Sequence, residues 1–223
     1  MKIIYHLSNF ILRLNLRIQA NWNVEGSLNI PKNGPLIIVC NHQSNFDPPL
    51  VAASISKRRT WFLVKSELFD GPKIAKIFLK AYGGFPLHKG KSDLNAYKWA
   101  LKKLNSGEAI VIFPEGKRNP RGLGKPYLGA ARIALKSRAP ILPISITGTE
   151  NLISWTTIFR PRGTLNVKIG KIIQYQKNTK NIEFKQIDEI NDKWKPYEGF
   201  KVNESNRKNK QQTGANDYEI YTS

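Results

Sequence analysis

Two short apolar runs constrain the fold of this chain more than any other feature. Leu36–Cys40 and residues 109–113 contain no polar residue, and the turn signal 31–35 precedes the first run. Continuous apolar runs of this length are typical of strands that are buried on both faces. We therefore predict buried strands at both places, with further strands over 61–64 and 141–146.

Segments with helical spacing lie between the predicted strands. A helix is predicted to begin at Asp47, where two prolines suit the first turn and Asp47 can act as the N-terminal cap. Apolar residues recur at helical spacing in three further segments: 72–82, 92–104 and 129–137. Helices that alternate with buried strands indicate an α/β fold. We expect a single α/β domain with a central mixed sheet flanked by helices.

The N-terminal segment also has helical spacing, and its apolar residues share one face: Ile3, Ile4, Leu7, Phe10, Ile11, Leu14 and Ile18. Polar residues interrupt this segment, so we do not expect it to cross a membrane. Two interpretations stay open: an N-terminal amphipathic membrane-interface helix, where apolar burial and cationic attraction add, or an ordinary helix that covers the core. The segment 72–82 is a second basic amphipathic helix, because its lysines lie opposite its apolar residues.

The composition changes near the end of the chain. From Lys201 onward the chain is rich in Asn, Lys, Gln, Ser and Thr and loses its apolar periodicity. Such a segment cannot bury enough surface to offset the entropy of ordering. We therefore predict three parts: a membrane-associating segment over 1–30, a folded domain over 31–200 and a disordered polar tail over 201–223.

A large positive charge limits the class of partner. Lysine and arginine number 36 against 16 aspartates and glutamates, which gives a formal net charge of +20. Such an excess attracts polyanions: nucleic acid, an anionic bilayer or an acidic carrier protein. The single cysteine excludes an intrachain disulfide, so a cytoplasmic setting is expected. The scattered histidines give no metal-ligand spacing, and we expect no metal and no cofactor.

The first candidate for chemistry is a histidine and aspartate pair. His42 follows the first predicted strand, and Asp47 lies five positions further on. A loop of this length can bring the carboxylate back to the imidazole, where it would fix the tautomer and stabilise the imidazolium for general-base work. Because a Gly-x-Ser-x-Gly motif is absent, the nucleophile would be a hydroxyl of the substrate. The alternative is a loop histidine beside a capping aspartate.

A second polar cluster, residues 113–118, stands where the predicted strand over 109–113 ends. Ligand-binding groups gather at the carboxyl ends of strands in α/β sheets. Arg118 offers a planar fork of donors for a phosphate, Gly116 allows close approach of the backbone, and Glu115 can accept hydrogen bonds from substrate hydroxyls. The alternative is a solvated charged turn.

These two clusters occur in order with two other segments, 83–89 and 139–144. With all four present, the chain over roughly 35–150 resembles the glycerolipid acyltransferase family, which includes the 1-acylglycerol-3-phosphate acyltransferases. The family's Asn-His-x-x-x-x-Asp motif is matched by Asn41, His42 and Asp47. Its Phe-Pro-Glu-Gly-x-Arg motif is matched by residues 113–118.

The resemblance implies a role for each matched residue. His42 would be the catalytic base and Asp47 its orienting carboxylate. The second motif implies acceptor binding by three residues: Glu115, Gly116 and Arg118. The chain departs from the family at Lys89, where an arginine is usual, and at Asn119, where serine or threonine is common. Lysine is a point charge without the bidentate fork of arginine, which makes the identity of the acceptor less secure.

The function implied is transfer of a fatty acyl group from an acyl thioester to the free hydroxyl of a lysophosphatidate-like acceptor in phospholipid biosynthesis. The thioester would be carried by acyl-carrier protein or coenzyme A, and no covalent intermediate would form. Lys89 and Arg118 would bind the acceptor phosphate, with Lys65 as a weaker third candidate. We expect a peripheral (monotopic) protein on the cytoplasmic face of an anionic membrane, with 31–200 as its catalytic domain.

Three alternatives stay open. The acceptor can be a different lysolipid. A basic nucleic-acid-binding protein would use the positive charge and the aromatic residues, but no recognised motif appears and we expect no nucleic-acid partner. An acyl-cysteine at Cys40, two residues before His42, is disfavoured because an apolar strand raises the pKa of a thiol.

Overall fold

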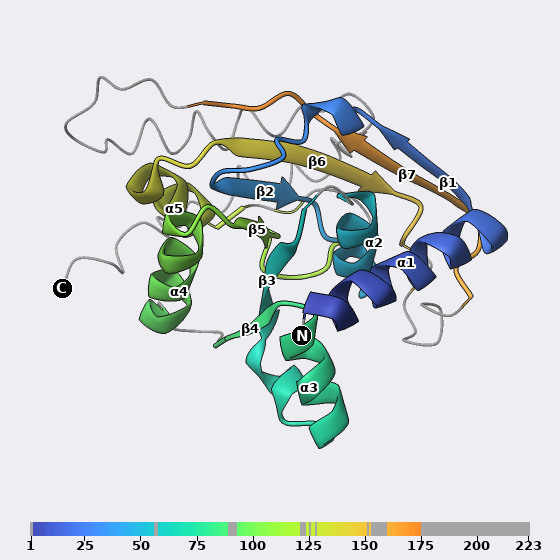
Figure 1. Cartoon of the computed structure of the whole chain (residues 1–223), viewed down its shortest axis with the longest axis horizontal. Coiled ribbons are helices and arrows are strands. Elements are labelled where there is room, and N and C mark those ends of the chain that lie inside the picture. The colour runs from blue at the N-terminus through green and yellow to red at the C-terminus, as the bar shows by residue number, and fades with distance from the viewer. Residues whose placement is uncertain are drawn as a thin grey trace, which may run out of the picture.

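The computed structural model describes residues 2–55, 58–88, 93–120, 124, 126–127, 129–150, 152 and 160–174. In this part of the chain, helices cover both faces of a central sheet (Figure 1). The polar tail predicted over 201–223 lies outside the described residues, and so does Lys89.

The described strands form a seven-stranded sheet in the order β1-β7-β6-β2-β5-β3-β4. Neighbouring strands are parallel except β6 and β7, which are antiparallel, so the prediction of a mixed sheet is confirmed. Strand β2 lies at the centre, between β5 and β6. The strands are β1 (Asn21–Glu25), β2 (Leu36–Cys40), β3 (Thr60–Lys65), β4 (Gly84–Leu87), β5 (Ala109–Ile112), β6 (Ile141–Thr147) and β7 (Thr164–Ile169).

Strand β2 is buried on both of its faces. Ile38 and Cys40 belong to a core cluster that includes residues of α1 and α2, whereas Ile37 and Val39 belong to a second cluster with residues of α4 and α5. Because successive side chains of a strand point to opposite faces, this position requires an unbroken apolar run. The helices are α1 (Lys2–Gln19), α2 (Asp47–Ser54), α3 (Lys73–Ala81), α4 (Leu94–Asn105) and α5 (Gly129–Ser137), with short 3-10 turns η1 (Ser27–Asn29) and η2 (Ser66–Phe69).

The predicted strands and helices are all found, and the sheet contains three strands that the sequence analysis did not predict. Strands β1 and β7 pair with each other at one edge of the sheet, and the third, β4, lies at the opposite edge beside β3. In β7 exposed and buried residues alternate, and in β1 exposed and half-buried residues alternate. Short alternating segments are a weaker signal than unbroken apolar runs. The first thirty residues therefore contribute an edge strand as well as a helix.

Helix α1 carries apolar residues on two faces. Tyr5, Leu12 and Leu16 are buried, and the Tyr5 hydroxyl lies 2.8 Å from Oγ1 of Thr60 on β3. The face predicted from the sequence points outward instead, because its apolar residues are 46% to 80% exposed: Ile3, Ile4, Leu7, Phe10, Ile11, Leu14 and Ile18. Other residues of α1 thus cover the core. In the described ranges, no helix combines the length and apolar character needed to cross a bilayer.

Gly148 allows the chain to turn sharply where β6 ends. Its φ of +92° lies in the left-handed region, and a Cβ atom here would stand 1.9 Å from the carbonyl oxygen of Thr164 on β7. Only glycine avoids this overlap. The turn leads into Thr149, whose hydroxyl contacts Gln43 and Asp47 in the segment that follows the neighbouring strand β2.

We predict that Gly148→Ala lowers the free energy of unfolding more than the matched variant Gly34→Ala. Gly34 has a similar φ of +88°, but a Cβ atom there meets no atom within 4 Å. Gly34→Ala should lose only the left-handed strain, about 1–2 kcal/mol. Gly148→Ala should lose roughly 2 kcal/mol more because of the overlap with Thr164. Urea unfolding measures both losses, and equal values would contradict this account of the turn.

Candidate active site

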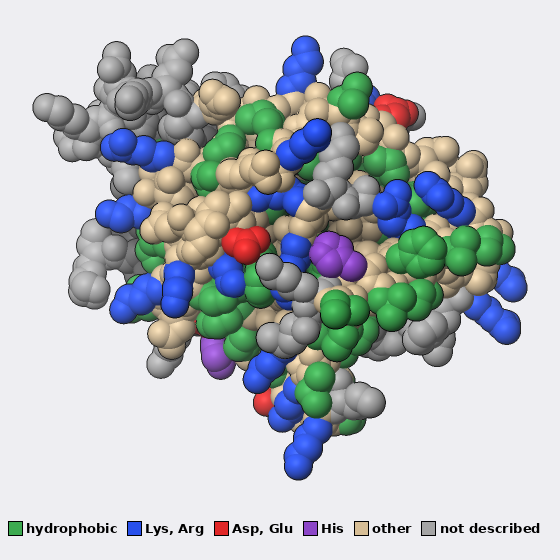
Figure 2. Space-filling model, in the orientation of Figure 1, with side chains coloured by type: hydrophobic (Ala, Val, Ile, Leu, Met, Phe, Trp, Pro, Cys, Tyr) green, Lys and Arg blue, Asp and Glu red, His purple; other side chains and the backbone are tan. Residues whose placement is uncertain are grey.

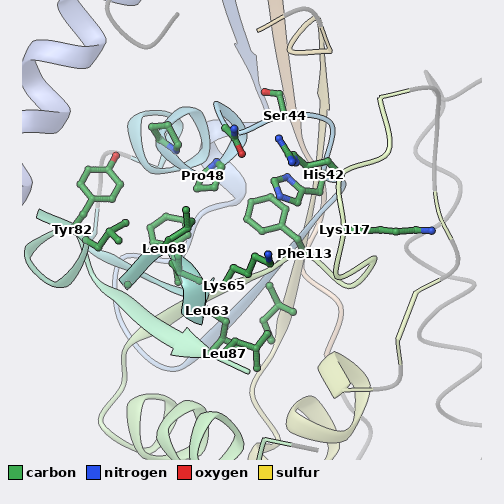
Figure 3. A pocket seen from close by; sticks show the side chains of 18 of the residues that line it. His42, Ser44, Pro48, Leu63, Lys65, Leu68, Tyr82, Leu87, Phe113 and Lys117 are labelled. Carbon is green, nitrogen blue, oxygen red and sulfur yellow. The ribbon is translucent and has the colours of Figure 1, made fainter. Parts of the chain in front are cut away.

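His42 lies in the loop between β2 and α2, at the carboxyl end of the central strand. Its Nδ1 atom lies 2.8 Å from Oδ2 of Asp47. The ring also stacks on Phe113, with 4.4 Å between the ring centroids and 29° between the planes. Figure 3 shows the two rings one over the other. A carboxylate and an aromatic ring therefore hold the imidazole in place.

Asp47 is the first residue of α2, and the cap position is Phe46, which makes no side-chain hydrogen bond to the helix. The prediction that Asp47 caps the helix is therefore wrong. Its carboxylate turns back into the loop, where Oδ2 accepts hydrogen bonds from the main-chain N–H groups of Gln43 at 2.6 Å and Ser44 at 2.8 Å. The physical reason is that the loop, together with the ring of His42, surrounds this oxygen with donors.

Thr149, a residue outside the predicted site, also contacts Asp47. Its Oγ1 atom donates a hydrogen bond to Oδ1 of Asp47 at 2.6 Å, and both side chains are fully buried. A buried carboxylate is costly unless donors satisfy it, and here both oxygens have donors. Sequence reasoning missed Thr149 because the chain does not reveal that β6, which precedes it, is the neighbour of β2.

The carboxylate determines which ring nitrogen of His42 can act as a base. Because Oδ2 of Asp47 accepts a hydrogen bond, Nδ1 carries the proton and Nε2 keeps its lone pair. This tautomer follows from the hydrogen-bond network. The site can therefore take a proton from a hydroxyl group placed beside Nε2.

Asn41, the residue before His42, fastens the loop to the neighbouring strand. Its side chain accepts a hydrogen bond from the N–H of Ile146 at 2.7 Å and donates one to the carbonyl of Ile146 at 2.9 Å. The asparagine of the Asn-His motif thus binds the main chain of β6 and fixes the position at which His42 leaves the sheet.

Glu115 contacts the main chain of His42. Oε1 accepts a hydrogen bond from the His42 N–H at 2.9 Å, and Oε2 accepts from the Gly124 N–H at 2.7 Å and from the side chain of Asn119. The Asn119 N–H donates to the His42 carbonyl at 2.6 Å. Burial raises the pKa of the Glu115 carboxyl, although these hydrogen bonds partly offset the rise. Both oxygens bind the chain itself, and acceptor binding by Glu115 stays a prediction.

A cavity of about 870 Å³ opens beside His42. Figure 3 shows His42 and Phe113 at one end and Tyr82 at the other. Lys65 extends toward Phe113 in this view, whereas Lys117, which also lines the cavity, extends its side chain away from His42 and Phe113. The lining of the cavity is mostly apolar and includes Leu12, Phe62, Leu63, Leu68, Phe78 and Leu87.

The structure brings most of the predicted site residues together. His42, Asp47 and Glu115 share one hydrogen-bond network, and Gly116 and Arg118 line the cavity with His42. These hydrogen bonds join residues of the chain to one another. The roles proposed for these residues toward a substrate therefore stay predictions.

Of the two lysines predicted to bind the acceptor phosphate, the structure describes only Lys65. Lys89 lies outside the described residues. Lys65 lines the cavity, and its Nζ atom pairs with Glu67 at 3.0 Å near the surface, where both side chains are about half exposed.

Cys40 is fully buried beneath the loop. Burial raises the pKa of its thiol well above the usual value, and the charges of Asp47 and Glu115 raise it further. A thiol in this environment stays protonated and is a poor nucleophile. Among the described residues, no group of three His, Cys, Asp or Glu side chains is placed to hold a metal ion.

Comparison with known proteins gives a consistent result. Residues 21–147 match the Acyltransferase family model. The 1-acyl-sn-glycerol-3-phosphate acyltransferase of Streptococcus pneumoniae is 26% identical over 202 residues, which cover 85% of this chain and 74% of that protein. The protein of the same name from Borreliella burgdorferi is 30% identical over 157 residues, which cover 69% of this chain and 62% of that protein.

A solved structure is also similar. It is the crystal structure of the 1-acyl-sn-glycerophosphate (LPA) acyltransferase PlsC from Thermotoga maritima, with a TM-score of 0.65 and 29% identity. The match covers 85% of this chain and 75% of that one. The family match spans more than half of the chain and includes both sequence motifs, so the chain belongs to the Acyltransferase family. It is an acyltransferase similar to the 1-acyl-sn-glycerol-3-phosphate acyltransferases.

Proposed function

We propose that the protein moves a fatty acyl group from an acyl thioester to the free hydroxyl of a lysophosphatidate-like acceptor in phospholipid synthesis. The observation that carries this proposal is the His42–Asp47 pair at one end of a mostly apolar cavity. A general base next to a space for an acyl chain is what acyl transfer to a hydroxyl requires. The names of the similar proteins support this class of acceptor.

The proposed reaction uses one base in two steps. Nε2 of His42 takes the proton of the acceptor hydroxyl as the hydroxyl oxygen attacks the acyl carbonyl. The tetrahedral intermediate then expels the carrier thiolate, which receives the proton from the imidazolium. Asp47 holds the ring and stabilises the imidazolium between the two steps. The carrier is acyl-carrier protein or coenzyme A, and the burial of Cys40 supports a route without a covalent intermediate.

We propose that the cavity binds the fatty acyl chain. Burial of a methylene group in an apolar environment contributes about 0.8 kcal/mol, so a long chain gains much by entering. We place the acyl carbonyl near His42 and the chain along the wall that includes Leu63 and Leu68, toward Tyr82. The ring of Tyr82 stacks on Phe78 with 5.8 Å between the centroids, which makes this end of the cavity aromatic.

We propose that the basic side chains that line the cavity with His42 bind the phosphate of the acceptor. Arg118 lines the cavity and offers two parallel N–H donors, which suit a phosphate. Lys65 lines the same cavity from the end of β3. Gly116 allows the phosphate to approach the main chain, and Lys89 and Glu115 complete the proposed acceptor site.

His42→Ala should lower kcat by about 10²–10⁴-fold without loss of folding, because a general base commonly contributes this much. Asp47→Asn should also be severely impaired, since the amide does not fix the required tautomer. Cys40→Ser is the control and should retain most activity. The assay is acyl transfer to lysophosphatidate from both thioester donors. Turnover near that of the wild type in folded His42→Ala protein would contradict the mechanism.

Arg118→Ala should lower kcat/KM about ten- to a hundredfold for a phosphorylated acceptor, because a charge-assisted hydrogen bond is lost. For the matched acceptor without phosphate, the wild type should already be slow and the substitution should cost little more. Lys117→Ala is the control, since the Lys117 side chain extends away from His42 and Phe113 in Figure 3. Equal penalties on the two acceptors would assign Arg118 to the fold or to the donor.

We also propose that the outward face of α1 binds an anionic membrane, as part of a peripheral (monotopic) protein on the cytoplasmic face. Figure 2 shows hydrophobic side chains in a row along α1 and again over α3, with lysines and arginines around them. On α3, Ile77 and Phe78 are 63% and 52% exposed. Leu12 of α1 and Phe78 of α3 line the cavity, so this surface adjoins the space assigned to the acyl chain.

Replacing Leu7, Ile11 and Leu14 together by serine should reduce binding to anionic vesicles severalfold with little change in melting temperature, because these side chains are 50% to 57% exposed. Leu28→Ser is the matched control, since Leu28 is 90% exposed on η1 and should leave binding unchanged. Vesicle co-sedimentation and thermal unfolding are the two measurements. A sharp fall in melting temperature with unchanged binding per folded molecule would assign this face to the core.

A further inference from the structure

We infer that Thr149 is a positioning residue for the base, acting on His42 through the carboxylate of Asp47. This inference rests on the proposed function, because it concerns the same proton transfer. The two oxygens of Asp47 have different partners: Oδ2 faces Nδ1 of His42 at 2.8 Å, and Oδ1 accepts from Thr149 at 2.6 Å. The Thr149 hydroxyl therefore binds the carboxylate oxygen of Asp47 that does not face the His42 ring.

Contacts with the loop alone leave the carboxylate less well oriented. The N–H groups of Gln43 and Ser44 converge on Oδ2, the oxygen that also faces the ring. A rotation of the carboxylate about its bond to Cβ would exchange the two oxygens or tilt their plane relative to the imidazole. A donor to Oδ1 from a separate element opposes that rotation. Thr149 is such a donor, because it follows β6 rather than belonging to the loop.

The position of Thr149 is itself fixed by its surroundings. The preceding turn requires glycine at Gly148, and the Thr149 carbonyl accepts a hydrogen bond from the N–H of Leu152 at 2.9 Å. Oγ1 also lies 3.3 Å from Oε1 of Gln43. The hydroxyl has one proton, and the shorter contact to a charged acceptor takes it. The threonine is thus a rigid donor aimed at Asp47.

Thr149 acts without touching the substrate. It is fully buried, and it is not among the described residues that line the cavity. Its loss should therefore leave substrate affinity unchanged. The effect should instead be on His42, because a carboxylate that has lost one donor turns to regain it and holds the Nδ1–H tautomer less firmly. Nε2 then carries the proton part of the time and is unable to accept another.

The test compares Thr149→Val, which keeps the shape and removes the hydroxyl, with Thr149→Ser, which keeps the hydroxyl. Thr60→Val is the matched control, because Thr60 is also fully buried and its hydroxyl binds Tyr5 of α1 rather than Asp47. The measurements are kcat, KM for both substrates, melting temperature and the low-field proton NMR signal of the His42 Nδ1–H group, which His42→Ala identifies by its loss.

Thr149→Val should lower kcat about ten- to a hundredfold with unchanged KM values and should weaken or broaden the Nδ1–H signal. Thr149→Ser should restore both. Thr60→Val should lower the melting temperature and leave kcat and the signal as in the wild type. A Thr149→Val protein with normal kcat and a normal signal would overturn the inference, as would a loss of kcat that Thr60→Val reproduces or that Thr149→Ser fails to reverse.

The NMR comparison separates this inference from the proposed function. If the wild type transfers no acyl group to any lysolipid, the proposed function fails, but the Nδ1–H signal still reports whether Thr149 orients the pair. If the wild type is active and the signal is the same in Thr149→Val, the proposed function stands and the role of Thr149 is refuted.

Discussion

The buried carboxylate of Asp47 determines the conformation of the whole site. A fully buried carboxylate is tolerated only where donors surround it, and its donors come from the His42 loop and from the turn after β6. Those two places meet because β2 and β6 are parallel neighbours, with Cys40 paired to Ile144. A shift of either strand by one residue would remove donors from the carboxylate. The geometry of the base therefore depends directly on the register of the central strands β2 and β6.

Some polar residues of the two motifs bind the main chain and hold the His42 loop in place, whereas others line the cavity. Asn41 binds the main chain of β6, and Glu115 binds the main chain of His42, so both hold the loop in which the base lies. Arg118 and the ring of His42 line the cavity. A base with a buried carboxylate on its ring and another on its main chain has little freedom to move. Such preorganisation is what a proton transfer needs, because the geometry does not have to be assembled during the reaction.

The sequence predicts those features that depend on neighbours along the chain. The apolar run 36–40 indicates a strand buried on both faces, and the five-residue spacing of His42 and Asp47 indicates their pairing, which the structure has. Features that depend on tertiary neighbours were missed. Thr149 contacts Asp47 only because of the order of the strands, and the cap expected at Asp47 is replaced because the loop supplies better donors. Helical spacing identified the outward face of α1, but it did not show that a second set of residues on the same helix enters the core.

One edge of the sheet joins parts of the chain that are made at different times. Asn23 on β1 donates a hydrogen bond to Asn166 on β7, 143 positions later, and every residue of β1 pairs with a residue of β7. Pairing between such distant segments is slow, and a chain folds from its N-terminal side while it is still being synthesised. Helix α1 and β1 therefore leave the ribosome long before β7 exists to receive them. The apolar face of α1 is available to a lipid surface before the sheet closes and before His42 has its final neighbours.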